Sequence, residues 1–201
     1  MRIAVINEVS SREKNDKVLE ALKGLPDVEV FNVGMSSHGD EPELTYIHTG
    51  LMAAISLNSG AADMVVGGCG TGQGFLISAM QYPGVFCGLI TEPLDAWLFS
   101  QINAGNCISL ALNKGFGWAA DINLKYIFEK LFADPMGQGY PLHRAVSQGE
   151  SREKLKDINA AAHKDFQSVL DGIDRELITH VFTHRPFKEF IENYGKTEFI
   201  Y

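Results

Sequence analysis

The sequence lacks the features that identify several common classes of protein. Its cysteines number three, Cys69, Cys87 and Cys107, and this odd set at strand-like positions favours reduced thiols in the cytoplasm over a framework of disulfides. No apolar run approaches the ~20 residues that cross a bilayer, and Met1 and Arg2 lead directly into an apolar strand without a signal peptide. We therefore expect a cytoplasmic protein that contacts no membrane.

Basic residues are also scarce, since 17 Lys and Arg stand against 25 Asp and Glu and give a net charge of -8. A chain with this balance has no basic stripe that would pair with phosphates, so we expect no nucleic-acid partner. The balance does not exclude a small anionic ligand, which needs only a local positive field. With 201 residues, 45% of them hydrophobic, the chain is long enough for one α/β domain and an appendage.

Apolar runs alternate with helical patterns through the first two thirds of the chain. The apolar runs predict strands over residues 2–7, 28–33, 63–68, 85–90 and 107–111. The patterns between and after them predict helices over residues 10–23, 45–59, 73–81, 93–103 and 117–132, with a polar loop at residues 34–43. This alternation predicts an α/β fold, a doubly wound, Rossmann-like sheet of five parallel strands with right-handed crossovers.

The composition changes after Asp134, where a glycine- and proline-rich stretch begins. We divide the chain into an α/β domain over residues 1–134, a connector over residues 135–149 and a helical extension over residues 150–201. Within the extension, the pattern predicts helices at about residues 151–170, 173–182 and 187–194. The extension is too short to fold alone, so we expect it to pack on the core or on a partner subunit.

The central feature of the sequence is a glycine-rich turn after the third predicted strand. It reads Cys69-Gly70-Thr71-Gly72-Gln73-Gly74 and leads into an apolar segment that can start a helix. Amides at the start of a helix favour an oxyanion or a phosphate, and the same field favours the thiolate form of Cys69. The turn therefore indicates a nucleophile or base beside an anion cradle, with a tight glycine turn around a small buried cysteine as the alternative.

Further candidate residues lie at the ends of predicted elements. Glu8 follows the first strand, at the edge where α/β folds bind ligands, and either accepts a substrate hydroxyl or caps a helix. His48 lies on the second helix and either faces a ligand or lies on the surface. His180 and His184 are spaced for a metal on one helix face, but no carboxylate or cysteine completes the set, so we expect no metal site.

Several motifs occur together along the chain. They are Ile3-Ala4-Val5, Tyr46, His48, Cys69-Gly70-Thr71-Gly72, Gly74, Ile77-Ser78-Ala79, Glu92-Pro93, Leu98, Gln101, Asn103, Asn106, Gly139 and Arg144. In this order they resemble the type B ribose-5-phosphate isomerase and galactose-6-phosphate isomerase family. The resemblance covers about residues 1–145. It is more specific than Cys-Gly-Thr-Gly alone, because the downstream motifs follow in the family's order.

The resemblance implies an aldose–ketose isomerase that acts on a sugar or sugar phosphate through an enediolate, without a metal or an organic cofactor. It implies that Cys69 is the base that removes the proton next to the carbonyl. It also implies that Thr71 and the amides around Gly70, Gly72 and Gly74 hold the developing oxyanion.

The remaining site residues implied by the resemblance bind the substrate or belong to a second subunit. Glu8 keeps an acidic role, Asn103 hydrogen-bonds sugar hydroxyls and His48 faces the ligand. Arg144 reaches an anionic substrate across a subunit interface. The family's sites use residues of a neighbouring chain, so a homodimer or homotetramer is expected.

Four departures from the family pattern concern cationic or proton-transferring positions, and one of them is Met80-Gln81 in place of an Asn-Lys pair. Val9 replaces a phosphate-binding histidine, Ile102 replaces the histidine that helps to open the sugar ring, and Tyr140 replaces an arginine. Either the substrate is not a standard sugar phosphate, or another subunit completes the site. The alternatives are a non-catalytic carbohydrate-binding homologue and a subunit of a hetero-oligomeric isomerase. A nucleotide- or flavin-binding module fits less well, because the glycine turn follows the third strand and not the first.

Overall fold

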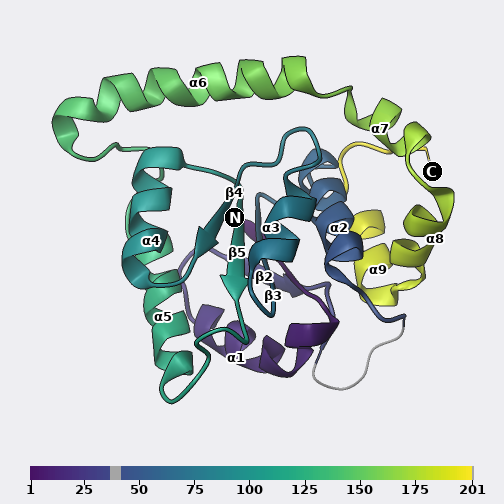
Figure 1. Ribbon diagram of the computed structural model, residues 1–201, viewed down its shortest axis with the longest axis horizontal. Helices are drawn as coiled ribbons and strands as arrows, with labels where there is room; N and C mark the ends of the chain where they lie inside the picture. Colours follow the sequence, from purple (N-terminus) through teal and green to yellow (C-terminus); the bar gives the residue numbers. More distant parts are fainter. Residues whose placement is uncertain (37–41, 201) are drawn as a thin grey trace.

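The computed structural model describes residues 1–36 and 42–200, so part of the predicted loop at residues 34–43 lies outside the described residues. Five parallel strands form one sheet in the order β2-β1-β3-β5-β4 (Figure 1). The strands are β1 (Arg2–Asn7), β2 (Glu29–Asn32), β3 (Met64–Cys69), β4 (Cys87–Ile90) and β5 (Cys107–Ala111). This confirms the predicted five-stranded parallel α/β fold.

Successive residues of each strand pack against different helical layers, because side chains alternate across a strand. In β1, Ile3 and Val5 face one layer, and Ala4 and Ile6 face the other. The helices of the first layer are α1 (Asn15–Leu22), α4 (Pro93–Leu98) and α5 (Ala120–Leu131), and those of the second are α2 (Tyr46–Asn58) and α3 (Gln73–Ala79). Helices on both faces explain why the strands are nearly continuous hydrophobic runs.

The strand order brings the loops after β1, β3 and β5 together at one end of the sheet. The chain leaves β1 toward β2 on one side, and β3 lies on the other side of β1. Ligands of open α/β sheets bind at such a switch point, outside the carboxyl ends of the strands. The Cys69 turn and Glu8 therefore lie at the same edge of the sheet. The sequence predicted each of them directly after a parallel strand.

Several helices differ from their predicted extents. The first begins with a 3-10 helix, η1 (Val9–Lys14), before α1. The predicted helix over residues 93–103 is α4 followed by a π-helix, η2 (Phe99–Asn103), because the N–H of Ala104 donates to the carbonyl of Phe99, 2.8 Å away.

The C-terminal region contains more helices than predicted. They are η3 (Leu142–Arg144), α6 (Ala145–Ala162), α7 (Phe166–Gly172), α8 (Arg175–Thr183) and α9 (Arg185–Tyr194). The single helix predicted over residues 151–170 is wrong, because the chain is extended at His163 and restarts where the Asp165 side chain accepts the N–H of Ser168, at 3.0 Å. Helix α6 also begins inside the range predicted as a connector.

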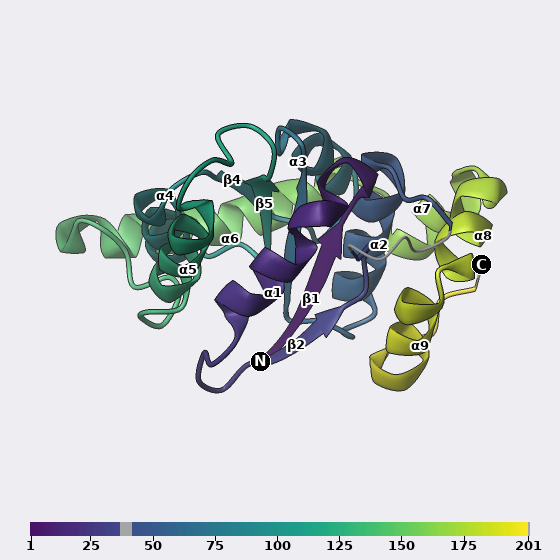
Figure 2. The ribbon, with the colours of Figure 1, turned by 90° about the horizontal axis from the view of Figure 1, so that it is seen from below.

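Helices α7 to α9 extend the core beyond α2, on the side of the molecule opposite α4 and α5 (Figure 2). Phe187 is fully buried, and the ring of Phe190 lies 4.9 Å from that of Phe31 in β2. The N–H groups of Lys196 and Thr197 donate to the carbonyl of Ser59 at 2.7 and 3.1 Å. This segment is therefore anchored by both apolar packing and backbone hydrogen bonds.

Helix α6 has no buried residue and runs across the amino ends of β4 and β5 (Figure 1). Its side chains Val146, Leu155 and Ile158 are exposed. A cavity of about 600 Å³ separates α6 from Phe86 and Cys87 at the start of β4. Within residues 1–36 and 42–200, no helix combines the length and apolar character that a membrane crossing requires.

Candidate functional site

The Cys69 turn follows β3 directly, and the geometry of the turn depends on its glycines. Gly72 has φ +75°, and a Cβ there would lie 2.5 Å from Cδ1 of Leu89. A Cβ on Gly74 would lie 2.9 Å from the ring of Tyr46. Any side chain at these two positions would displace the turn. The positive φ of Gly72 and the close approach of neighbouring side chains at both positions require glycine.

Cys69 is largely buried, with 5% of its surface exposed, and it belongs to the core cluster on the α2 and α3 side of the sheet. Its carbonyl accepts the N–H of Leu112 at 3.0 Å, which holds the end of β3 against β5. Thr71, two residues later, is exposed. The turn therefore passes from a largely buried cysteine to an exposed threonine within two residues.

The backbone amides of the turn do not all point the same way. The N–H of Gly70 donates to Oγ of Ser10 at 3.0 Å, and the N–H of Gln73 donates to Oγ1 of Thr71 at 3.3 Å. Within the described parts of the chain, no acceptor lies in hydrogen-bond range of the N–H groups of Thr71 and Gly72. Among the described residues, the amides of Thr71 and Gly72 therefore remain available to a ligand, while that of Gly70 donates to Ser10.

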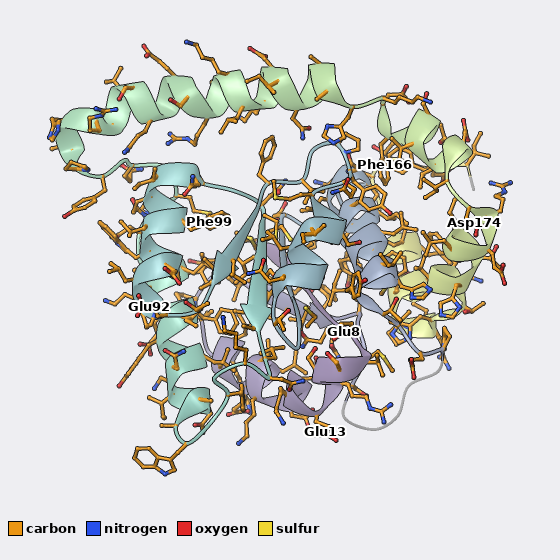
Figure 3. The ribbon with its side chains drawn as sticks, in the orientation of Figure 1. Glu8, Glu13, Glu92, Phe99, Phe166 and Asp174 are labelled. Atoms are coloured by element: carbon orange, nitrogen blue, oxygen red, sulfur yellow. The ribbon has the colours of Figure 1, made fainter. Side chains whose placement is uncertain are left out.

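Glu8 lies beside this turn at the carboxyl ends of the strands (Figure 3). It is 4% exposed, and its carboxylate accepts the hydroxyl proton of Ser10. The backbone carbonyl of Ser10 accepts the side-chain amide of Asn113, which follows β5, at 2.6 Å. The sequence patterns did not single out Ser10 or Asn113 as site residues, although both follow strands that end at the same edge of the sheet.

His48 has a structural role in the fold. Its Nδ1 accepts the N–H of Thr45 at 3.0 Å and completes a capping box at the start of α2. Its ring stacks on that of His180 in α8, with centroids 4.1 Å apart, and Nε2 of His180 donates to the carbonyl of Glu43 at 2.9 Å. Burial and the neighbouring His180 lower the pKa of His48 from its ordinary value of 6.5.

This lowered pKa predicts a loss of stability in mild acid. The folded protein binds fewer protons at His48 than the unfolded chain does, so this contribution is present above pH 6.5 and declines as the pH falls below it. We expect His48→Gln to flatten the decline, because glutamine keeps the cap at this position without titrating. Urea unfolding at pH 7.5 and 5.5 measures the effect.

The exposed His143 provides a matched control, since it lies in η3, far from the stacked pair. His143→Gln should leave the difference in unfolding midpoint between the two pH values as it is in the wild type. An unchanged pH dependence in His48→Gln would contradict the assignment of this titration to His48.

Asn103 and Arg144 lie at the other end of the sheet from Cys69. Asn103 closes the π-helix just before the amino end of β5, and Arg144 lies in η3. The guanidinium of Arg152 ties α6 to this end, donating to the carbonyls of Ile102 and Gly137 at 2.9 and 3.0 Å. A six-residue strand is about 20 Å long, so one chain does not bring these residues to Cys69. Figure 3 labels Phe99, the first residue of the π-helix, far from Glu8.

The spacing of His180 and His184 raised the question of a metal site. Within residues 1–36 and 42–200, no three His, Cys, Asp or Glu side chains are grouped so that they could hold a metal ion. Nε2 of His180 donates a hydrogen bond to the carbonyl of Glu43, and Nε2 of the buried His184 lies 3.2 Å from the carbonyl of Gly34. These two histidines join the extension to the core.

Comparisons with known proteins agree with this architecture. The profile of the Ribose/Galactose Isomerase family matches residues 3–131. A crystal structure of 4-deoxy-L-threo-5-hexosulose-uronate ketol-isomerase in complex with a tartrate is 44% identical, with a TM-score of 0.95 over 98% of this chain and 94% of that one. A ribose-5-phosphate isomerase from Vibrio parahaemolyticus is 46% identical, with a TM-score of 0.93 over the same shares. A search among curated proteins found no match.

A third structure shows how far the similarity to shorter chains extends. The ribose 5-phosphate isomerase of Thermotoga maritima is 25% identical, with a TM-score of 0.55, and the match covers 97% of that chain but 74% of this one. The first two structures, by contrast, are matched over almost the whole of this chain. This chain is therefore similar to them beyond the α/β domain.

Proposed function

Because the chain belongs to the Ribose/Galactose Isomerase family and is a sugar isomerase, we propose that it interconverts an aldose and a ketose with Cys69 as the proton-transferring base. The observation that carries this proposal is the position of Cys69 at the last residue of β3. There the exposed Thr71 and the amides of Thr71 and Gly72, which have no acceptor among the described residues, follow Cys69 within three residues at the switch point of the sheet.

The reaction needs one carbon-bound proton to move between neighbouring carbons. The Cys69 thiolate removes the proton from the carbon next to the carbonyl, and the electron pair of that C–H bond forms an enediolate. The N–H groups of Thr71 and Gly72 and the Thr71 hydroxyl stabilise the negative oxygen, and such stabilisation contributes more than any other effect to the rate of many enzymes. The resulting thiol then returns the proton to the adjacent carbon, and the hydroxyl proton of the substrate moves from one enediolate oxygen to the other, so that the carbonyl and the hydroxyl exchange places. Glu8 accepts a hydrogen bond from a substrate hydroxyl during this exchange.

A second copy of the chain completes this site. Asn103 and Arg144 lie at the amino ends of the strands within one chain, so they can meet substrate only at the Cys69 turn of a partner. The exposed apolar residues of α6 and the adjacent cavity of about 600 Å³ provide a surface that a second copy can cover. In a homodimer with two-fold symmetry, each chain then contributes to both sites.

The substrate is best described as an open-chain carbonyl sugar with an anionic group. Ile102 offers no proton for ring opening and Val9 offers no charge, so a substrate that is not held in a ring fits these residues better. One of the two most similar structures above is named for a hexosulose uronate, a carbonyl sugar with a carboxylate, and the other for ribose 5-phosphate. Arg144 can pair with either anion.

The test is a panel of sugars incubated with the enzyme in deuterated water. It contains ribose 5-phosphate, galactose 6-phosphate, 4-deoxy-L-threo-5-hexosulose uronate and unphosphorylated pentoses and hexoses. We expect deuterium at the carbon next to the carbonyl of one substrate class, with the uronate ahead of the phosphates. Tight binding of a sugar with no incorporation into any of them would replace this proposal with the non-catalytic carbohydrate-binding homologue, which the departures at Val9, Ile102 and Tyr140 favour.

A further inference from the structure

Three loops at the carboxyl edge are joined by side-chain and backbone hydrogen bonds. The loop after β1 contributes Glu8 and Ser10, the loop after β3 contributes Gly70, and the loop after β5 contributes Asn113 and Lys114. These strands are neighbours in the sheet, in the order β1, β3, β5. Ser10 is 60 positions from Gly70 and 103 positions from Asn113, so only the folded sheet brings the loops together.

Ser10 occupies the centre of this arrangement. Its hydroxyl donates to the Glu8 carboxylate, and its oxygen accepts the N–H of Gly70 at 3.0 Å. A hydroxyl that donates to a carboxylate becomes a better acceptor, so the two bonds strengthen each other. Ser10 thus connects the acid after β1 with the peptide group that follows Cys69.

Gly70 is held from the opposite side as well. Its carbonyl accepts the N–H groups of Asn113 and Lys114 at 3.0 and 2.9 Å, and the Asn113 side chain donates to the carbonyl of Ser10 at 2.6 Å. A Cβ on Gly70 would lie 3.2 Å from Oγ of Ser10 and 3.3 Å from Nδ2 of Asn113. The two peptide groups that flank the Gly70 Cα are therefore both hydrogen-bonded to neighbours that fix their orientation.

We propose that Ser10 is a positioning residue for the isomerase reaction, with Asn113 as its support. Ser10 holds the Gly70 N–H away from the substrate, fixes the direction of the Thr71 and Gly72 amides and keeps the Glu8 carboxylate beside the turn. This inference rests on the proposed function, since it assigns Ser10 to the same site. It acts through preorganisation, because donors fixed before the reaction need no reorganisation when charge develops.

The experiment compares Ser10→Ala, Ser10→Thr and Ser11→Ala in the full-length protein. Ser11, in the same loop, is a matched control, because among the described residues its hydroxyl hydrogen-bonds to the backbone carbonyls of Glu8 and Gly68, at 3.2 and 3.4 Å, and not to Gly70. We expect Ser10→Ala to lower kcat about 10- to 100-fold with KM within about 3-fold, as for a loss confined to the transition state. Ser10→Thr keeps the hydroxyl and should recover most of kcat, and Ser11→Ala should stay within about 2-fold of wild type.

Two further measurements distinguish a positioning role of Ser10 from a general loss of structure in the variant and from an absence of isomerase activity in the wild type. In a double-mutant cycle, Ser10→Ala should add little to Glu8→Gln, because both break the same bridge. Amide hydrogen exchange should show faster exchange at Gly70 in Ser10→Ala and unchanged exchange in Ser11→Ala.

Suppose that the wild type turns over a sugar. The proposal for Ser10 alone is then overturned if Ser10→Ala keeps the wild-type kcat, or if the effects of Ser10→Ala and Glu8→Gln are additive in the cycle. If instead the wild type turns over no sugar, the proposed function fails, and Ser10 has no reaction to position. Unchanged exchange at Gly70 in Ser10→Ala would remove the structural basis of the proposal in either case.

Discussion

Cys69→Ala is expected to lower kcat for isomerisation by about 10³-fold or more and to abolish solvent deuterium incorporation at the carbon next to the carbonyl. The change removes the sulfur and leaves the main chain of the turn intact, so the Thr71 and Gly72 amides and the Glu8 carboxylate remain in place. A loss of 10³-fold corresponds to about 4 kcal/mol of transition-state stabilisation. Because the binding groups persist, we expect the affinity for substrate in calorimetry to change by less than about 3-fold.

The buried Cys107, the first residue of β5, provides the matched control for this substitution. Cys107→Ala removes the same atoms at the other end of the sheet, and we expect it to cost stability while kcat stays close to that of the wild type. Circular dichroism and urea unfolding confirm that both variants are folded. Exchange at the wild-type rate in Cys69→Ala would show that another group is the base, and Glu8 would then be the next residue to test.

Two inactive variants, one lacking Cys69 and one lacking Asn103 and Arg144, are expected to regain activity when they are mixed. In a symmetric dimer, a mixed pair has one site with both halves intact and one site with both halves removed. Random exchange makes about half of the dimers mixed, so the mixture should reach about a quarter of the wild-type activity. The expectation follows from the positions of these residues at opposite ends of the sheet in one chain.

The control for this experiment is a mixture of Cys69→Ala with Glu8→Gln. Both changes lie at the same edge of one chain, so each mixed dimer has two sites with one defect each, and activity should not rise above the sum of the two variants. Light scattering and native mass spectrometry establish that mixed dimers form. Mixed dimers of the first kind without recovered activity would place Asn103 and Arg144 outside the site and contradict the shared arrangement.

Much of the fold was accessible from local patterns in the chain. The apolar runs and the helical patterns between them predicted the five parallel strands, because burial on both faces requires continuous hydrophobic residues. The Cys69 turn was recognisable because its glycines are required by a positive φ at Gly72 and a close approach at Gly74. The family could be named from this turn together with the motifs that follow it in the family's order, and the profile match over residues 3–131 confirms the family.

Other features depend on residues that are distant in sequence, and local patterns contain no information about them. Ser10 bonds Gly70, 60 positions away, and Asn113 bonds Ser10, 103 positions away. The contact of His48, a predicted ligand-facing residue, with the ring of His180 in α8 also joins positions that are far apart in the sequence. The division of the extension at His163 also depends on where α7 can bury Phe166 against the core.

The order of elements and the nucleophile candidate thus follow from periodicity and a short glycine motif, whose physical causes act within a few residues. The isomerase family follows from the resemblance that this motif and the downstream motifs carry together. The partners of Glu8, the role of His48 and the separation of Asn103 and Arg144 from Cys69 follow from strand order and packing. Folding alone sets these relations, because loops from different strands meet only when the sheet has assembled.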